Sequence, residues 1–170
     1  AEIFQGQNAD PLAQIVAAYE NGDSGAYPLA YLGIIKIARD PVLRRQIPTA
    51  LARLTLLMDR PGLTTETRHQ VPHVRMLLQL SLGDVELWKT VLTSDEKSLN
   101  AYDHLGLHGT MAYLLLDLPG AKKKILLRHL GRVYAETKNR GVAEAIHVLM
   151  DPKSMYRAFK KNGGRDRDFY

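Results

Sequence analysis

The sequence predicts an all-α protein: a compact globule of about eight helices, one or two of them central and buried, with no β-sheet. Three observations support this prediction. Apolar residues recur at the helical spacing of i, i+3, i+4 and i+7. Residues that start and stop helices divide the chain, and no stretch alternates cleanly between apolar and polar residues as a strand would. The first apolar set at helical spacing comprises Leu12, Ile15, Val16 and Tyr19.

Helix starts are marked by three Asp-Pro pairs, at residues 10–11, 40–41 and 151–152. An N-cap Asp accepts hydrogen bonds from first-turn amides, and a Pro that follows it lacks an amide that would otherwise have no partner. Thr64 and Ser94 are further N-cap candidates, because acidic residues follow them in the first turn. Glycines stand where helices are expected to stop. These glycines are Gly22, Gly62, Gly83, Gly120, Gly141 and Gly163.

The first expected helix begins at Pro11, and the others follow in chain order. They cover residues 27–38, 42–58, 65–82, 84–92, 99–118, 121–139, 142–150 and 152–161. Proline is expected to break or kink two of them, at Pro48 and at Pro72. Trp88, the single tryptophan, is expected to anchor the core from a short helix.

Two segments, residues 27–38 and 105–116, are apolar on nearly every side, which is typical of central helices. We therefore expect one domain over residues 1–163. The last residues, 164–170, are expected to form a mobile tail. A solenoid is a weaker alternative, since the Asp-Pro starts follow no fixed period.

The composition excludes several classes of protein. The charged fraction of 24% is ordinary, which argues against an intrinsically disordered chain. The absence of cysteine excludes disulfide scaffolds, thiol catalysis and cysteine-held metal clusters, and it suits a reducing compartment, for which we expect the cytoplasm. The longest apolar runs are under half the length of a membrane-spanning helix, so we expect no membrane insertion.

Positive charge is concentrated near the C-terminus. The formal net charge is +5. Residues 1–85 hold eight Lys/Arg and eight Asp/Glu, residues 86–117 hold two and five, and residues 118–163 hold eleven and three. On a helix over residues 121–139, Lys124, Arg128 and Arg132 fall at i, i+4 and i+8 and form one stripe of charge.

This distribution predicts a non-catalytic domain that binds RNA or DNA mainly through the phosphate backbone, as one component of a nucleoprotein assembly. No motif separates RNA from DNA, and we favour RNA. The alternative is a protein-interaction or self-assembly domain, a homo-oligomer or a binder of acidic proteins, whose basic face meets acidic surfaces. The expected binding residues are Lys122, Lys123, Lys124, Arg128, Arg132, Lys153, Arg157, Lys160 and Lys161.

No motif supports an enzyme, and we expect neither a cofactor nor a metal. Gly-x-Ser-x-Gly, the phosphate-binding loop and Gly-x-Gly-x-x-Gly are all absent. Two histidine pairs at i, i+4, His69 with His73 and His104 with His108, leave a metal site as a minor hypothesis. The interpretation that we favour is a set of half-buried, hydrogen-bonded imidazoles.

Overall fold

The computed structural model describes residues 10–22, 27–94 and 107–153, and within these ranges the side chains of residues 27–32 and 107–109 are not described. This part of the chain contains nine α-helices and no strand, which confirms the all-α prediction. The helices group into two compact units, residues 1–82 and 83–170. The single domain predicted over residues 1–163 stays a prediction. The expected tail and most of the expected last helix, residues 154–161, lie outside the described residues.

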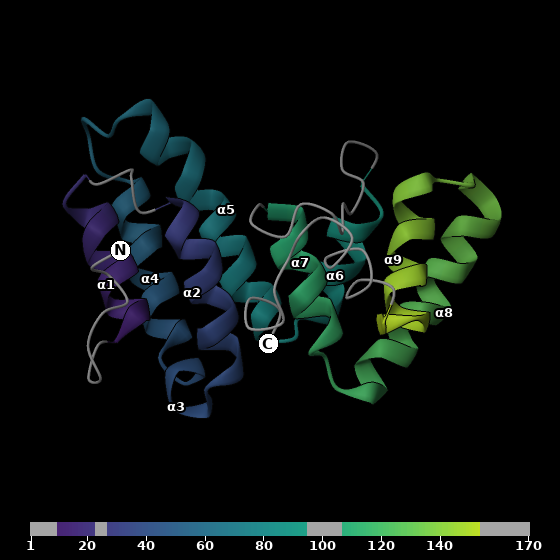
Figure 1. Cartoon of the computed structure of the whole chain (residues 1–170). Coiled ribbons are helices and arrows are strands. Elements are labelled where there is room, and N and C mark those ends of the chain that lie inside the picture. The colour runs from purple at the N-terminus through teal and green to yellow at the C-terminus, as the bar shows by residue number, and fades with distance from the viewer. Residues whose placement is uncertain (1–9, 23–26, 95–106, 154–170) are drawn as a thin grey trace. The chain divides into compact units, whose positions relative to one another are not determined.

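The first unit contains five helices: α1 (Pro11–Glu20), α2 (Tyr27–Arg39), α3 (Pro41–Arg44), α4 (Ile47–Met58) and α5 (Thr65–Ser81). Both α1 and α5 pack against α2 and α4, and the short α3 packs on α2 (Figure 1). The four apolar residues that predicted the first helix are all buried on α1. The helical spacing therefore identified the inner face of α1 correctly.

Side-chain caps begin three helices of this unit, α1, α3 and α5, where the sequence indicated. The Asp10 carboxylate accepts hydrogen bonds from the amides of Leu12 and Ala13, at 3.0 and 3.1 Å. Asp40 caps α3 in the same way, and the Thr64 hydroxyl accepts from the third residue after it at the start of α5. The caps satisfy amides that have no partner inside the helix.

The two internal prolines have different outcomes. The helix expected over residues 42–58 is broken before Pro48, which lies in the first turn of α4, where its missing amide costs nothing. Pro72, by contrast, lies inside a continuous α5, so of the expected break or kink the break does not occur there. Pro72 and Arg68 are both exposed, and water can hydrogen-bond the Arg68 carbonyl that Pro72 leaves without an amide. The burial of Val71 and Val74 anchors the helix on both sides of the proline.

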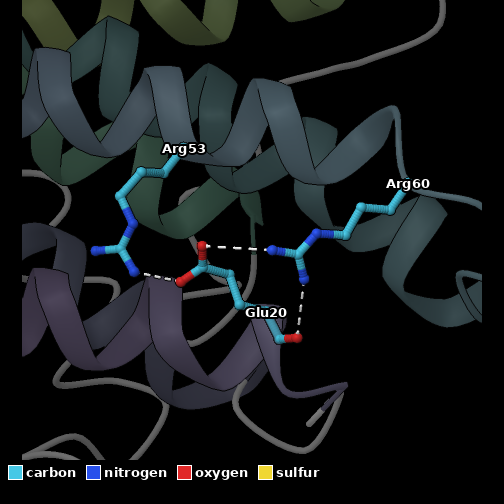
Figure 2. A network of polar contacts seen from close by, with 3 residues as sticks. All are labelled: Glu20, Arg53 and Arg60. Atoms are coloured by element: carbon cyan, nitrogen blue, oxygen red, sulfur yellow. Dashed lines mark hydrogen bonds and ion pairs between the residues drawn. The ribbon is translucent and has the colours of Figure 1, made fainter.

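An ionic clamp ties the end of α1 to α4 (Figure 2). The carboxylate of Glu20, the last residue of α1, accepts a hydrogen bond from the Arg53 guanidinium and lies 4.0 Å from that of Arg60. Arg60 also donates to the Glu20 main-chain carbonyl at 3.3 Å. These two cations are thus occupied in holding the first unit together.

The second unit contains four described helices: α6 (Val85–Leu92), α7 (Leu107–Leu116), α8 (Gly120–Thr137) and α9 (Arg140–Met150). The helices α6, α7 and α8 all pack against α9, and α6 also packs against α8 (Figure 1). Trp88 on α6 is fully buried, as expected of a core anchor. Asp84 caps α6, and the Asn139 side chain caps α9.

The expectation of central helices is met most clearly by α7. All six side chains from Thr110 to Leu115 are buried, so every side of this stretch faces protein. Of the segment expected over residues 99–118, the residues before 107 lie outside the described part. On α2 the described Ile34 and Ile37 are buried, whereas Lys36 and Arg39 near its end are exposed.

Glycine ends helices at two of the six expected positions. Gly22 and Gly83 directly follow the C-caps of α1 and α5, with φ of 79° and 81°, a backbone region that glycine enters without steric cost. Gly62, with φ of 77°, lies in the turn after α4, three residues beyond the C-cap Asp59. Gly120 is the first residue of α8 and Gly141 the second residue of α9, so those two predictions were wrong. Gly163 and the helix expected to follow Ser94 lie outside the described residues.

The left-handed residue that ends α8 is Lys138, with φ of 53°. Its ammonium lies 5.0 Å from the centre of the Tyr134 ring, a cation–π contact that offsets part of the steric cost. Because the Asn139 cap follows directly, the turn to α9 needs no glycine.

Within the described ranges, no helix is both long enough and apolar enough to cross a membrane.

Candidate functional site

Five of the nine predicted binding residues lie on α8. Three of the five, Lys124, Arg128 and Arg132, are exposed, and Lys122 and Lys123 are half-buried. Lys153 is exposed a few residues after the end of α9. Arg157, Lys160 and Lys161 lie outside the described residues. The described site is therefore built chiefly on α8.

The three exposed cations form one row along the outer side of α8, which we call the α8 stripe: Lys124, Arg128 and Arg132. At a rise of 1.5 Å per residue, successive members are about 6 Å apart along the helix axis, and the row spans about 12 Å. The next residue at this spacing is Glu136, which is also exposed and ends the row with an acidic residue. The stripe is thus a defined cationic line rather than a generally basic surface.

The opposite face of α8 holds the helix in the core. Leu126 and Leu130 are fully buried, and α8 packs there against α6 and α9. Because both leucines anchor the same face, the helix cannot rotate without removing them from the core. The orientation of the α8 stripe toward solvent is therefore a consequence of core packing.

Small residues surround the α8 stripe. Ala121, Gly131 and Ala135 are exposed, and helical spacing places them on the same side of α8 as the three cations. A Cβ built on Gly131 meets no atom within 4 Å. A polymer backbone can therefore approach the helix closely between the long cationic side chains. The sequence analysis did not single out these three residues, although the spacing that defined the stripe also identifies them.

Lys122 has a structural contact instead. Its ammonium donates a hydrogen bond to the main-chain carbonyl of Gly83 at 2.8 Å. A Cβ at Gly83 would lie 2.5 Å from the Lys122 Nζ, so the glycine makes room for this contact. Lys122 thus joins the start of α8 to the turn that precedes α6, and it does not extend the stripe.

The cations of the α8 stripe have no acidic partner among the described residues. Four other basic residues of this part of the chain, Arg53, Arg60, Lys89 and Arg140, do form ion pairs with glutamates. For the stripe, neither an ion pair nor a hydrogen bond is found within the described ranges. Its charges are available to an external anion.

Local helix stability does not explain why α8 begins with lysines. The positive end of the helix dipole favours acidic residues in the first turn, but the first turn of α8 has none. Pro119, at the N-cap, supplies no side-chain hydrogen bond to the free amides. Lysines near this end raise the local positive potential further, which costs stability and attracts anions.

Among the described residues of the second unit, no tryptophan, tyrosine or phenylalanine ring is exposed for stacking bases. Trp88 and Tyr113 are buried, and Tyr134 is half-buried beneath the Lys138 ammonium. Proteins that bind single strands by stacking use exposed aromatic rings. The chemistry that the described residues of this unit offer is therefore charge directed at phosphates.

The histidines assemble no metal centre within the described residues. The rings of His69 and His73 on α5 are in an edge-to-face arrangement with centroids 5.1 Å apart. No set of three or more His, Asp or Glu side chains in this part of the chain converges as metal ligands would. The side chains of His104 and His108 lie outside the described residues, so that pair stays a hypothesis.

Comparison with known proteins identifies no relative of this chain. No family model matches the sequence, and neither the curated proteins nor the solved structures contain a match.

Proposed function

We propose that this protein is a non-catalytic nucleic-acid-binding protein that contacts the phosphate backbone through the α8 stripe, with RNA favoured over DNA, as part of a nucleoprotein assembly. The observation that carries the proposal is a row of three cations, unpaired within the described ranges, on the outer face of a helix whose inner face is fixed in the core. Contacts of this kind position a protein on the backbone and carry little sequence information.

The energetic basis of the proposed binding is the release of counterions from the nucleic acid. Each neutralised phosphate contributes about 0.9 to the slope of log affinity against log salt for a duplex, and about 0.7 for a single strand. Three contacts at the α8 stripe would then contribute about 2.1 to 2.7 to this slope. They would account for a roughly 20- to 40-fold loss of affinity between about 50 and 200 mM salt.

One observation favours the alternative of an acidic protein partner. Ile125, adjacent to Lys124 in sequence and near the stripe by helical spacing, is 45% exposed. An apolar side chain beside cations is typical of protein–protein interfaces, which combine an apolar centre with a charged rim. The experiments must therefore separate phosphate contacts from protein contacts.

The first experiment is the ratio of absorbance at 260 to 280 nm of freshly purified protein, before and after a high-salt wash. Co-purified nucleic acid raises this ratio, and salt lowers it by displacing phosphates from the cations. A protein-like ratio throughout, together with association that persists after nuclease treatment, would support the acidic-partner alternative.

The decisive experiment compares the triple variant K124Q/R128Q/R132Q with the unmodified chain. Binding of a short labelled RNA of mixed sequence, single-stranded and annealed to its complement, is measured by fluorescence anisotropy across a salt series. We expect the slope to fall by about 2.1 for the single strand and about 2.7 for the duplex.

The matched control is R68Q/K89Q/R140Q, which removes three positive charges away from the stripe. Lys89 and Arg140 already pair with glutamates, so their loss should leave the salt slope nearly unchanged. Equal effects from the two triple variants would show that net charge alone drives binding. An unchanged affinity in K124Q/R128Q/R132Q would contradict the proposed site.

A further inference from the structure

A second group of cations lies in the first unit, where α2 turns into α3. Lys36 and Arg39 occupy the last turn of α2, Arg44 ends α3, and Arg45 follows it. All four side chains are exposed. Asp40 is the only acidic residue among residues 36–45. We call this group the α2–α3 corner: Lys36, Arg39, Arg44 and Arg45.

Main-chain hydrogen bonds keep the α2–α3 corner short. The Asp40 amide donates to the Ile37 carbonyl at 3.2 Å, and the Arg44 amide donates to the Asp40 carbonyl at 2.9 Å. Asp40 itself has an extended backbone, with φ of −103° and ψ of 114°, so one non-helical residue separates α2 from α3. With eight steps at the helical rise and one extended step, the chain from Lys36 to Arg45 covers about 15 Å.

The one carboxylate within the corner is engaged by the backbone. Oδ1 of Asp40 accepts hydrogen bonds from the amides of Val42 and Leu43, at 2.8 and 3.3 Å. As the N-cap of α3, this carboxylate is held against the first turn of that helix. It offsets one positive charge, and the corner still holds Lys36, Arg44 and Arg45 against this single carboxylate among residues 36–45.

The charges of the corner repel one another when no anion is bound. Lys36, Arg44 and Arg45 form neither an ion pair nor a side-chain hydrogen bond within the described ranges. The Debye length at physiological ionic strength is about 8 Å, so repulsion is appreciable between close neighbours such as Arg44 and Arg45 and is largely screened between the two ends of the corner. A polyanion would relieve this repulsion at several points at once, whereas a single small anion would relieve it at one.

We propose that the α2–α3 corner is a second surface that contacts the phosphate backbone of the same nucleic acid, through Lys36, Arg44 and Arg45. This inference rests on the proposed function and extends it to a unit whose total charge gives no indication of binding. Charge complementarity identifies the ligand as a polyanion, and the phosphate-directed chemistry of α8 favours nucleic acid over an acidic protein.

The experiment uses the full chain and the same labelled RNA as for α8. The variant R44Q/R45Q removes two positive charges from the corner. Its matched control, R68E, changes the net charge by the same amount at an exposed position on α5 of the same unit. We expect R44Q/R45Q to lower the slope of log affinity against log salt by about 1.4 to 1.8. The affinity that this variant loses between about 50 and 200 mM salt should then be roughly 7- to 12-fold smaller than the loss for the unmodified chain. R68E should leave the slope nearly unchanged.

The outcomes separate this inference from the proposed function. An unchanged slope in R44Q/R45Q, with a reduced slope in K124Q/R128Q/R132Q, overturns the corner and leaves α8 in place. The reverse pattern supports the corner and overturns the α8 stripe. An equal effect of R68E overturns the inference, because net charge would then explain the result. Absence of RNA binding by the unmodified chain overturns both proposals.

A competition experiment tests the choice of polyanion. Poly-L-glutamate is titrated into the complex of the unmodified chain with labelled RNA, and its direct binding to R44Q/R45Q is then measured. If R44Q/R45Q loses affinity for poly-L-glutamate but not for RNA, the corner binds an acidic protein and the inference is wrong. Circular dichroism of each variant confirms that the helices remain folded.

Discussion

Two successive helices of the second unit, α7 and α8, use their surfaces in opposite ways. On α7, all the side chains from Thr110 to Leu115 are buried. On α8, one line of residues is buried at Leu126 and Leu130, while the line on the opposite side is cationic and exposed. Both helices pack against α9. The comparison shows that the buried side chains of α7 and α8 hold the second unit together, whereas folding does not require the exposed cations of α8.

This contrast can be tested because Trp88 reports on the second unit. It is the only tryptophan of the chain and is fully buried on α6. Its fluorescence during urea unfolding therefore follows this unit rather than the first. The four predictions below concern the free energy of unfolding measured in this way, from the largest effect to the smallest.

The largest loss is expected when the buried leucines of either helix are shortened. Leu115→Ala on α7 and Leu130→Ala on α8 each remove buried methyl groups and leave a cavity, which should cost about 2–5 kcal/mol. Ile125→Ala, at a side chain 45% exposed on the outer side of α8, should cost about 1 kcal/mol or less. A loss at Ile125 as large as that at Leu130 would contradict the two-sided description of α8.

A smaller loss is expected from Lys122→Met. Methionine keeps the length of the side chain but cannot donate a hydrogen bond to the Gly83 carbonyl. The free energy of unfolding should therefore fall by about 1–2 kcal/mol. Because Lys122 lies off the α8 stripe, we expect the salt slope of RNA binding to stay nearly constant. A slope reduced as strongly as by Lys124→Gln would instead place Lys122 in the binding surface.

An added glutamate should have a still smaller effect on the free energy of unfolding, with opposite signs at the two ends of α8. Ala121→Glu puts an acid in the first turn, where the helix dipole favours it, and should stabilise the protein by about 0.3–1 kcal/mol. Ala135→Glu puts the same charge near the last turn and should destabilise it by a similar amount. Both glutamates lie on the side of the stripe, so both should weaken RNA binding. Stronger binding by Ala121→Glu would argue against phosphate contacts at this end of α8.

The smallest effect on stability is expected from the stripe itself. Lys124→Gln, Arg128→Gln and Arg132→Gln should each change the free energy of unfolding by no more than about 0.5 kcal/mol, since the three side chains are exposed and unpaired within the described part of the chain. These same variants should have the largest effect on binding. A loss of 2 kcal/mol or more, on the order of a core substitution, would mean that the cations stabilise the fold, and the case for a binding surface would fail.

Sequence reasoning identified the helices and the α8 stripe because both depend on local spacing. It did not detect the α2–α3 corner, since the charges of residues 1–85 cancel in a sum over that length. A shorter window over residues 36–45 would have contained four cations and one acid. The relevant length for charge is the Debye length, which is far shorter than half of this chain.

The sequence by itself determined where the helices begin, because an N-cap such as Asp10, Asp40 or Thr64 acts through hydrogen bonds only two or three residues away. It also determined which face of α1 and of α8 is apolar. Tertiary structure alone decided that α5 continues through Pro72, because buried neighbours on both sides outweigh one missing hydrogen bond. It also decided that Lys122 binds Gly83 while Lys124 has no partner among the described residues, since that choice depends on a contact between residues 39 positions apart.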